Sequence, residues 1–310
     1  MDKITIALLL LIHSTVIFGQ ADGDGAPAAP AATVDSIPFV LTEHNNISVR
    51  ALLNQVDTVN LMLHTAANSV TLIEAATQRL QSIQTNGVDT VNSWGGDQSS
   101  KYSTDNALQI GHQARDGLTI WENKNSGPGT DGKFGLNFFG DQIVEINFEE
   151  RYLKVYSTLT EEQILNRGYE KFTLLEENDC FFIEAVSQVK GEPIRNKFLI
   201  HSGFGGAILF DDATANQFGF TKHLAIIAES ELQDSYGNVL KTKKAILPQF
   251  SIANQQLTNV PIGFFEGSIG RQKMSVIGGE ILKRFNIIFD TQHSSIFLRA
   301  NELTQSPLFR

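Results

Sequence analysis

Cysteine is almost absent from this chain of 310 residues, in which Cys180 is the only one. A single cysteine excludes a framework of disulfides within the chain. Because Cys180 opens the apolar stretch CFFIEAV, we interpret it as a small buried hydrophobic residue and not as a reactive thiol. Basic residues are also few, and the formal net charge is −10. That balance argues against nucleic acid as a partner, because nonspecific nucleic-acid binding needs a basic surface.

Long apolar runs are missing as well, with one exception near the start. Residues 4–18 are mostly apolar, although His13, Ser14 and Thr15 interrupt them; they follow Lys3 and precede small residues. This run is shorter than the roughly 20 residues that a membrane-spanning helix needs. We therefore predict a signal peptide over residues 1–21, no transmembrane segment after it, and a secreted or periplasmic protein. Residues 22–36, rich in Ala, Pro and Gly, predict a flexible tether.

Short runs rich in Val, Ile, Leu, Phe and Thr make up most of the rest, separated by Gly, Asn and Asp. This alternation is typical of a mostly β protein. Two stretches favour helices instead. Apolar residues at three and four spacing predict a helix over residues 69–83, and Thr160 is a suitable N-cap for a helix within residues 159–167.

The chain contains an internal repeat. LMLHTAANSVTLI (residues 61–73) and FLIHSGFGGAILF (residues 198–210) each place a histidine where an apolar strand meets a tight turn. Each is followed later by a small-residue turn and further strands, in KFGLNFFGDQIVEINF and VIGGEILKRFNIIFD respectively. The repeat predicts an N-terminal lobe over residues 37–157 and a C-terminal lobe over residues 179–305, joined by a connector at 158–178.

These motifs resemble those of the aspartic proteases of the retropepsin and pepsin type, in their two-lobed, single-chain form. In that family each lobe carries an Asp-Thr/Ser-Gly turn after an apolar strand, and later an Ile/Leu-Gly motif. The resemblance covers about residues 37–300. It implies a mostly β fold of two similar six-stranded-barrel-like lobes with a cleft between them.

The resemblance also assigns roles to residues of both turns. It places His64 and His201 at the positions of the two catalytic aspartates. The residues that would brace the cleft are Thr65, Ser202, Ala66 and Gly203, of which Ala66 replaces a family glycine. The segment NSWGGDQSS (residues 92–100), with Trp94, Gly95 and Gly96, is the candidate for the flap over the cleft.

Replacement of both aspartates changes the expected chemistry. Two neighbouring carboxylates share one proton and hold a water between them, whereas each neutral imidazole offers a single acceptor. We therefore expect an inactive homologue that binds extended peptides in the cleft as a monomer, without a cofactor.

Two alternatives stay open at this point. The first is a peptidase with an unusual site, in which Asp211 or Asp212 supplies a carboxylate. The second is a metal-binding protein, because paired histidines are natural ligands of zinc or copper. A metal site would need a third ligand, for which His112 and His223 are the candidates.

Overall fold

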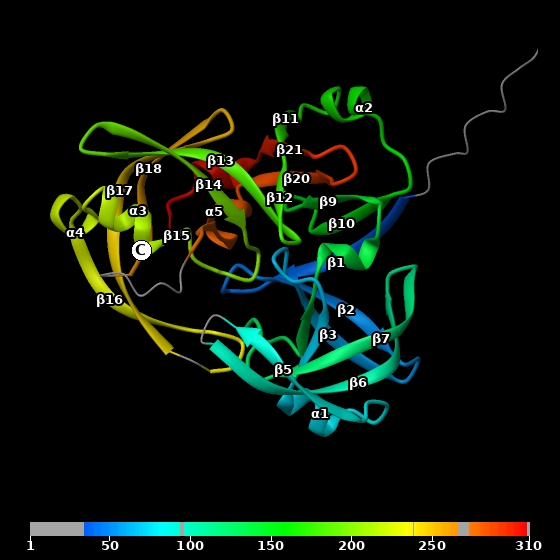
Figure 1. Ribbon diagram of the computed structural model, residues 1–310. Helices are drawn as coiled ribbons and strands as arrows, with labels where there is room; N and C mark the ends of the chain where they lie inside the picture. The colour runs from blue at the N-terminus through cyan, green and yellow to red at the C-terminus, as the bar shows by residue number, and fades with distance from the viewer. Residues whose placement is uncertain (1–33, 94–95, 238, 266–272, 309–310) are drawn as a thin grey trace, which may run out of the picture. The chain divides into compact units, whose positions relative to one another are not determined.

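The computed structural model describes residues 34–93, 96–237, 239–265 and 273–308, which form a β-rich structure (Figure 1). The predicted signal peptide and most of the predicted tether lie outside these residues. Strand β1 (Val34–Leu41) nevertheless begins inside the stretch assigned to the tether, and Val34 pairs with Tyr156 of β10 (Tyr152–Tyr156). The tether prediction therefore extends too far. None of the helices in the described residues has the length and hydrophobicity of a membrane-spanning segment.

Six strands of the N-terminal half close into a barrel. In hydrogen-bonded order they are β2 (Ile47–Leu53), β3 (Asp57–Leu63), β8 (Gly132–Phe134), β4 (Val70–Ile73), β7 (Gln113–Asn123) and β6 (Gly96–Ile110). The ring closes where Leu53 of β2 pairs with Leu108 of β6. Strand β5 (Gly87–Ser93) extends the sheet beyond β6 as an edge strand.

The C-terminal half repeats this arrangement. Its ring consists of β13 (Cys180–Val189), β14 (Glu192–Ile200), β19 (Ser275–Ile277), β15 (Ile208–Phe210), β18 (Gln255–Phe264) and β17 (Val239–Ile252). Pairing of β17 with β13 closes it. Strand β12 (Leu175–Glu177) pairs with β13, and β16 (Ile226–Gln233) is the edge strand beyond β17.

The parallel pairs fall at equivalent places in the two rings, β3–β8 and β4–β7 in the first, β14–β19 and β15–β18 in the second. The repeat in the sequence is therefore also a repeat of strand topology. The prediction of a mostly β fold with two similar six-stranded lobes is confirmed.

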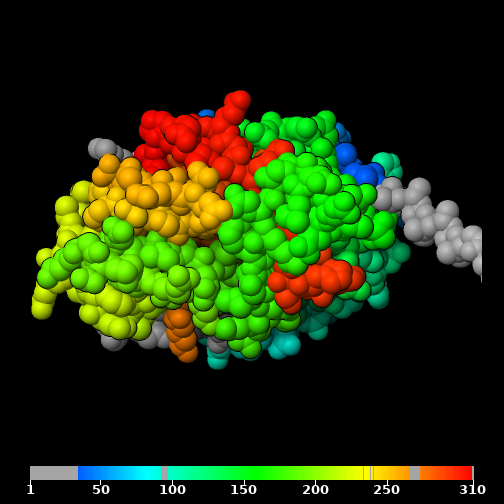
Figure 2. Space-filling model, turned by 90° about the horizontal axis from the view of Figure 1, so that it is seen from above, coloured from blue at the N-terminus to red at the C-terminus, as the bar shows by residue number. Residues whose placement is uncertain are grey.

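One antiparallel sheet contains strands of both halves, in the order β11-β21-β20-β9-β10-β1. Its remaining members are β9 (Ile143–Asn147), β11 (Glu170–Thr173), β20 (Phe285–Asp290) and β21 (Ser295–Ala300). Ile287 of β20 pairs with Ile146 of β9, so the last hairpin of the chain joins the sheet of the N-terminal half. Figure 2 shows red atoms of the C-terminal part beside green atoms of the middle of the chain, consistent with the pairing of β21 with β11.

The predicted connector at 158–178 is more structured than a linker. It contains β11, β12 and helix α2 (Glu161–Leu165). Thr160 caps α2 as predicted: Thr160 Oγ1 accepts a hydrogen bond from Gln163 N, and Gln163 Oε1 accepts one from Thr160 N. This reciprocal pair is a capping box, which satisfies two backbone N–H groups at the start of the helix.

The helix predicted over residues 69–83 is wrong in its first part. Val70–Ile73 is strand β4, and helix α1 covers only Glu74–Arg79. The four residues of β4 include three with β-branched side chains, and β4 pairs with both β7 and β8. Such pairing outweighs a helical spacing of apolar residues. The other helical segments are η1 (Leu136–Phe139), α3 (Asp212–Gln217), α4 (Phe220–His223), α5 (Gly279–Leu282) and η2 (Glu302–Gln305).

Phenylalanine fills the interior of both rings. Phe134, Phe138 and Phe139 meet edge to face in the N-terminal half, with ring centroids 5.5–6.0 Å apart. Phe198, Phe210, Phe220, Phe250 and Phe264 form an equivalent chain of contacts in the C-terminal half. These edge-to-face contacts add to the free energy gained by burying the rings.

Cys180 is half-buried, and the prediction that it is buried is therefore only partly correct. It packs at the margin of a small apolar cluster around Phe182 and Leu199. Desolvation, together with the charge of Asp179, raises the pKa of its thiol, which keeps the sulfur in its less reactive protonated form.

Candidate functional site

His64 and His201 occupy equivalent places in the two halves, directly after strands β3 and β14. The backbone N–H of His64 donates to Phe134 O at 2.9 Å, and that of His201 donates to Ile277 O at 3.0 Å. Each histidine carbonyl then accepts a hydrogen bond from the N–H three residues later, in Ala67 and Phe204. The two histidines thus begin matching turns at the ends of matching strands.

The two imidazole rings lie together. Their centroids are 4.5 Å apart and their planes are inclined by 55°. Nδ1 of each ring is buried and has no hydrogen-bond partner in the described part of the chain. The repeat in the sequence predicts similar turns, but only the folded chain shows that their side chains meet.

Gly203 makes room for the ring of His64. A Cβ atom at this position would lie 2.3 Å from His64 Cδ2 and 2.6 Å from His64 Nε2, closer than nonbonded atoms approach. Ala66, at the equivalent place in the first turn, is half-buried and packs at the margin of the apolar cluster that contains Leu199. A methyl group is therefore accommodated in one turn and excluded from the other.

Both rings are held in their neutral form. Desolvation lowers the pKa of His64 well below its usual 6.5, and the charges of His201 and Lys133 lower it further. Desolvation and the charge of Lys133 lower the pKa of His201 to about 4. A neutral imidazole carries one donor and one acceptor nitrogen, so at pH 7 the pair has no acidic imidazolium to donate a proton.

Thr65 and Ser202 brace the two turns against each other. Thr65 N donates to Ser202 Oγ at 3.0 Å, and Ser202 N donates to Thr65 Oγ1 at 3.0 Å. Each hydroxyl also donates to a carbonyl of the opposite half, Thr65 Oγ1 to Ile200 O and Ser202 Oγ to Leu63 O, both at 2.6 Å. Both residues are 2% exposed. The brace therefore gives hydrogen-bond partners to four buried backbone groups that solvent cannot reach: the N–H groups of Thr65 and Ser202 and the carbonyls of Leu63 and Ile200.

Two glycines allow the later motif of each half to approach its turn. A Cβ atom at Gly135 would lie 1.8 Å from Ala67 O, and one at Gly278 would lie 2.3 Å from Phe204 O. Any side chain at either position would force the backbones apart. These contacts explain why small residues recur in both halves of the sequence repeat.

Sequence reasoning missed Lys133 and Asn45. Lys133 lies in β8, beside the strand that directly precedes His64, and its charge acts on both histidines. Asn45 Nδ2 donates to Gly205 O at 2.9 Å and to Glu280 Oε2 at 3.0 Å, which joins the β1–β2 loop to the C-terminal half. Nothing in the sequence around a lysine within a strand or an asparagine in a turn indicates such partners.

The carboxylates considered as substitutes for the aspartates have structural partners. Asp211 is the N-cap of α3: Thr214 N donates to its Oδ1 at 2.7 Å, and Thr214 Oγ1 and Ser275 Oγ donate to its Oδ2 at 2.8 and 2.6 Å. Asp212 begins the first turn of the same helix. Within the described ranges Nδ1 of neither His64 nor His201 has a hydrogen-bond partner, so no carboxylate accepts from or donates to these two atoms.

The additional histidines considered as metal ligands do not join the pair. His112 is exposed, with its Nδ1 2.8 Å from Asp35 Oδ1, and His223 lies exposed at the end of α4. Among the residues that the structure describes, no group of three His, Cys, Asp or Glu side chains could hold a metal ion. The pair alone offers two ligands, fewer than the three or four of a zinc site.

The candidate flap corresponds to the hairpin of β5 and β6. Ser93 and Gly96 pair at its tip, while Trp94 and Gly95 lie outside the described residues. Because β5 pairs with β6 as β16 pairs with β17, the C-terminal half contains a topologically equivalent hairpin.

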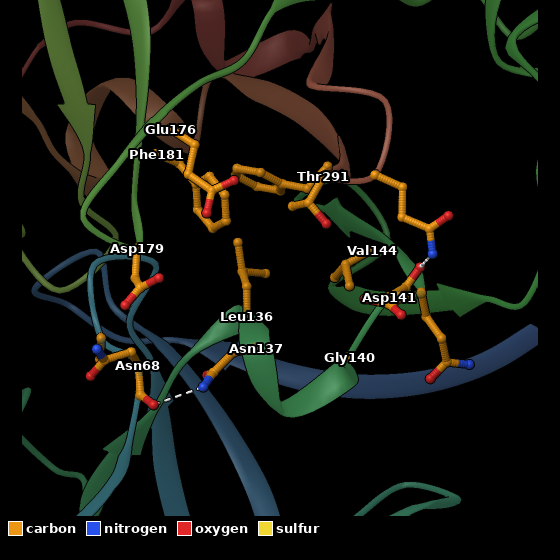
Figure 3. A pocket seen from close by; sticks show the side chains of 14 residues that line it. Asn68, Leu136, Asn137, Gly140, Asp141, Val144, Glu176, Asp179, Phe181 and Thr291 are labelled. Carbon is orange, nitrogen blue, oxygen red and sulfur yellow. Dashed lines mark hydrogen bonds between the residues drawn. The ribbon is translucent and has the colours of Figure 1, made fainter.

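A cavity of about 510 Å³ lies close to the first turn but is not lined by either histidine (Figure 3). Ala67 and Asn68 line it from the turn, together with the start of η1 and the turn between β12 and β13. Leu136 points into it opposite Phe181, and Asn137 Nδ2 donates to Asn68 O at 2.7 Å. Asp141, Glu176 and Asp179 give its lining an acidic character.

Comparison with known proteins identifies the architecture. No family model and no curated protein matches the sequence. The crystal structure of aspartic proteinase from Irpex lacteus is similar with a TM-score of 0.59, covering 89% of this chain and 100% of that one at 12% sequence identity. The fold is aspartic proteinase-like. At this identity the similarity concerns the fold and leaves the activity and the ligand open.

Proposed function

We propose that this chain binds an extended polypeptide between its two barrels and does not cleave it by the route that aspartic proteases use. In this proposal His64 and His201 occupy the positions of the two catalytic aspartates. The observation that carries it is the combination of an intact brace between Thr65 and Ser202 with two neutral imidazoles where the chemistry would occur.

The chemistry of the pair supports loss of the usual reaction. An aspartate dyad needs one ionised carboxylate to activate water and one protonated carboxyl to donate to the substrate carbonyl. The Nδ1 atoms of both imidazoles are buried without partners, so only Nε2 of each ring is left for a ligand. With the pKa of His201 at about 4, neither ring supplies a proton donor of suitable strength at neutral pH.

The ligand class is supported by the two edge strands. Strand β5 ends one sheet and β16 ends the other, and each belongs to a hairpin of its own half. An edge strand presents backbone N–H and C=O groups that an extended peptide can pair with, and side-chain pockets then select the sequence.

A peptide-library screen from pH 4 to 8, read by mass spectrometry, tests the proposal. We expect binding without cleavage by the native protein, and cleavage once His64→Asp and His201→Asp are combined. The matched control combines His44→Asp and His223→Asp, which makes the same chemical change at two exposed histidines. That control should bind peptides and leave them uncut.

Other outcomes would contradict the proposal in distinct ways. Cleavage by the native protein that is lost on His64→Ala or His201→Ala would establish a histidine-based hydrolase. Absence of any peptide binding by the folded native protein would refute the ligand class.

A further inference from the structure

Lys133 lies next to the histidine pair. It occupies the middle of β8, where it pairs in parallel with Met62 of β3, two residues before His64. The next residue, Phe134, accepts the hydrogen bond from His64 N through its carbonyl oxygen. The charge of Lys133 acts on both rings and lowers the pKa of His64 and of His201.

The tip of the hairpin formed by β16 and β17 contacts this lysine. Its tip reaches the N-terminal barrel (Figure 1), where Ser235 O accepts hydrogen bonds from Lys124 N at 2.9 Å and Asn125 N at 3.0 Å. Asn125 Nδ2 donates to Asp234 O at 3.2 Å. Lys133 Nζ donates to Ser235 Oγ at 2.6 Å. A hairpin of the C-terminal half is thereby attached directly beside the site.

The buried ammonium group of Lys133 has little compensation from hydrogen bonds or from opposite charge. An ammonium group has three N–H donors, and in the described residues the hydrogen bond to Ser235 is the one that Lys133 makes. Desolvation lowers its pKa to about 8, and the charge of Asp234 opposes this shift only in part. At pH 7 the group is nevertheless mostly protonated, so the site holds one cation beside two uncharged imidazoles.

We propose that Lys133, together with His64 and His201, binds a carboxylate group of the ligand. A carboxylate accepts up to four hydrogen bonds and donates none, which matches the unused donors of the ammonium and the N–H groups of the imidazoles. The hydrogen bonds from Lys133 would be charge-assisted and shorter than those between neutral groups. The inference rests on the proposed polypeptide ligand and specifies that it presents its C-terminal carboxylate or an acidic side chain here.

Calorimetric titration with three forms of a binding peptide from the library tests this assignment. The forms have a free C-terminus, an amidated C-terminus, and an amidated C-terminus with an added glutamate. We expect the carboxylate-bearing forms to bind at least about tenfold more tightly than the neutral one, as for loss of a charge-assisted hydrogen bond. The form that gains affinity distinguishes a terminal from a side-chain carboxylate.

Lys133→Met should remove this gain, whereas Lys124→Met, at an exposed lysine beside the same hairpin, should keep it within about twofold. Equal affinity of all three forms for the native protein, or full binding by Lys133→Met, would overturn the carboxylate assignment and leave peptide binding intact.

A second measurement needs neither a peptide nor a variant. Acetate added to the native protein should shift the imidazole ¹⁵N signals of His64 and His201 and raise their pKa values. If no peptide binds but acetate produces this shift, the polypeptide proposal fails while the carboxylate site stands. If peptides bind and acetate leaves both signals unchanged at saturating concentration, the carboxylate site is refuted.

Discussion

Thr65 and Ser202 each donate a backbone N–H to the hydroxyl of the other, and each hydroxyl donates to a carbonyl of the opposite half, so that the two halves of the chain meet through four hydrogen bonds of 2.6–3.0 Å. The brace lies directly after the two histidines and is almost completely buried. It sets the separation of the turns without depending on which residue stands at positions 64 and 201. The scaffold of the two turns is therefore compatible with histidine at both positions.

Removal of either hydroxyl should destabilise the fold. Thr65→Val or Ser202→Ala leaves buried N–H and C=O groups unpaired, at a cost of about 1–3 kcal/mol each in the free energy of unfolding. Because the two residues share hydrogen bonds, the double variant should cost less than the sum of the single ones. Chemical denaturation measures these values. Thr58→Val at an exposed position of β3 is the control, expected to stay within about 0.5 kcal/mol; strict additivity would argue against a shared network.

Gly203→Ala should destabilise the protein because its methyl group would overlap the ring of His64. We expect a cost of about 1–3 kcal/mol, as for other overpacked sites. Adding His64→Ala should recover most of this loss, since it removes the atoms in conflict. Gly263→Ala, whose Cβ would first meet the flexible end of Leu209 at 3.1 Å, serves as the comparison. No recovery in the double variant would show that the conflict lies elsewhere.

The histidine pair should make stability depend on pH. The pKa of His201 is about 4 in the folded chain and 6.5 in the unfolded one, and that of His64 is also lowered. Between pH 4 and 6.5 the unfolded chain therefore binds more protons, so stability is complete above pH 6.5 and falls as the pH decreases. The slope is up to about 1.4 kcal/mol per pH unit for each proton.

Thermal unfolding between pH 5 and 8 measures this slope. Combining His64→Asn with His201→Asn should flatten the profile, because neither position then titrates. Combining His44→Asn with His223→Asn, at two exposed histidines, should leave the dependence of stability on pH as it is in the native protein. An unchanged slope in the first double variant would mean that the pair is not the source of the pH dependence.

Glu145 is the centre of a buried polar network. Its carboxylate is 0% exposed, accepts two hydrogen bonds from Arg167 Nη2 at 2.7 and 2.6 Å, and accepts one each from the hydroxyls of Tyr156 and Tyr169. Burial by itself would raise the pKa of Glu145, but the hydrogen bonds from Arg167, Tyr156 and Tyr169 outweigh it and the pKa is lowered.

Glu145→Gln should therefore cost about 3–5 kcal/mol at pH 7, since it leaves Arg167 without its buried partner. The lowered pKa means that the native network is fully stabilising above the unfolded pKa of about 4.5 and is lost as the pH falls through the folded value. Urea denaturation of native protein and variant at pH 7 and pH 3 should show the difference shrinking at low pH. Glu184→Gln, from an exposed ion pair with Arg195, should have little effect at either pH.

The sequence by itself determined the repeat, the β class and the positions of the two turns. These features are local: apolar runs bounded by turn residues specify strands, and a repeated order of motifs specifies repeated topology. Thr160 at the start of α2 is predictable for the same reason, since a capping box needs only neighbouring residues. The adjacency of His64 and His201 could be expected only through resemblance to a family, because they are far apart in the chain.

Tertiary structure decided what depends on distant partners. Val70–Ile73 is a strand because β7 and β8 lie on either side of it, although its apolar spacing also suits a helix. Lys133 lies beside the histidines because β8 pairs with β3, and the tip of the β16–β17 hairpin then encloses it. Both β3 and the tip of the β16–β17 hairpin are far from position 133 in the sequence. Strand pairing and burial, which join segments far apart along the chain, gave this lysine its lowered pKa and the site its charge.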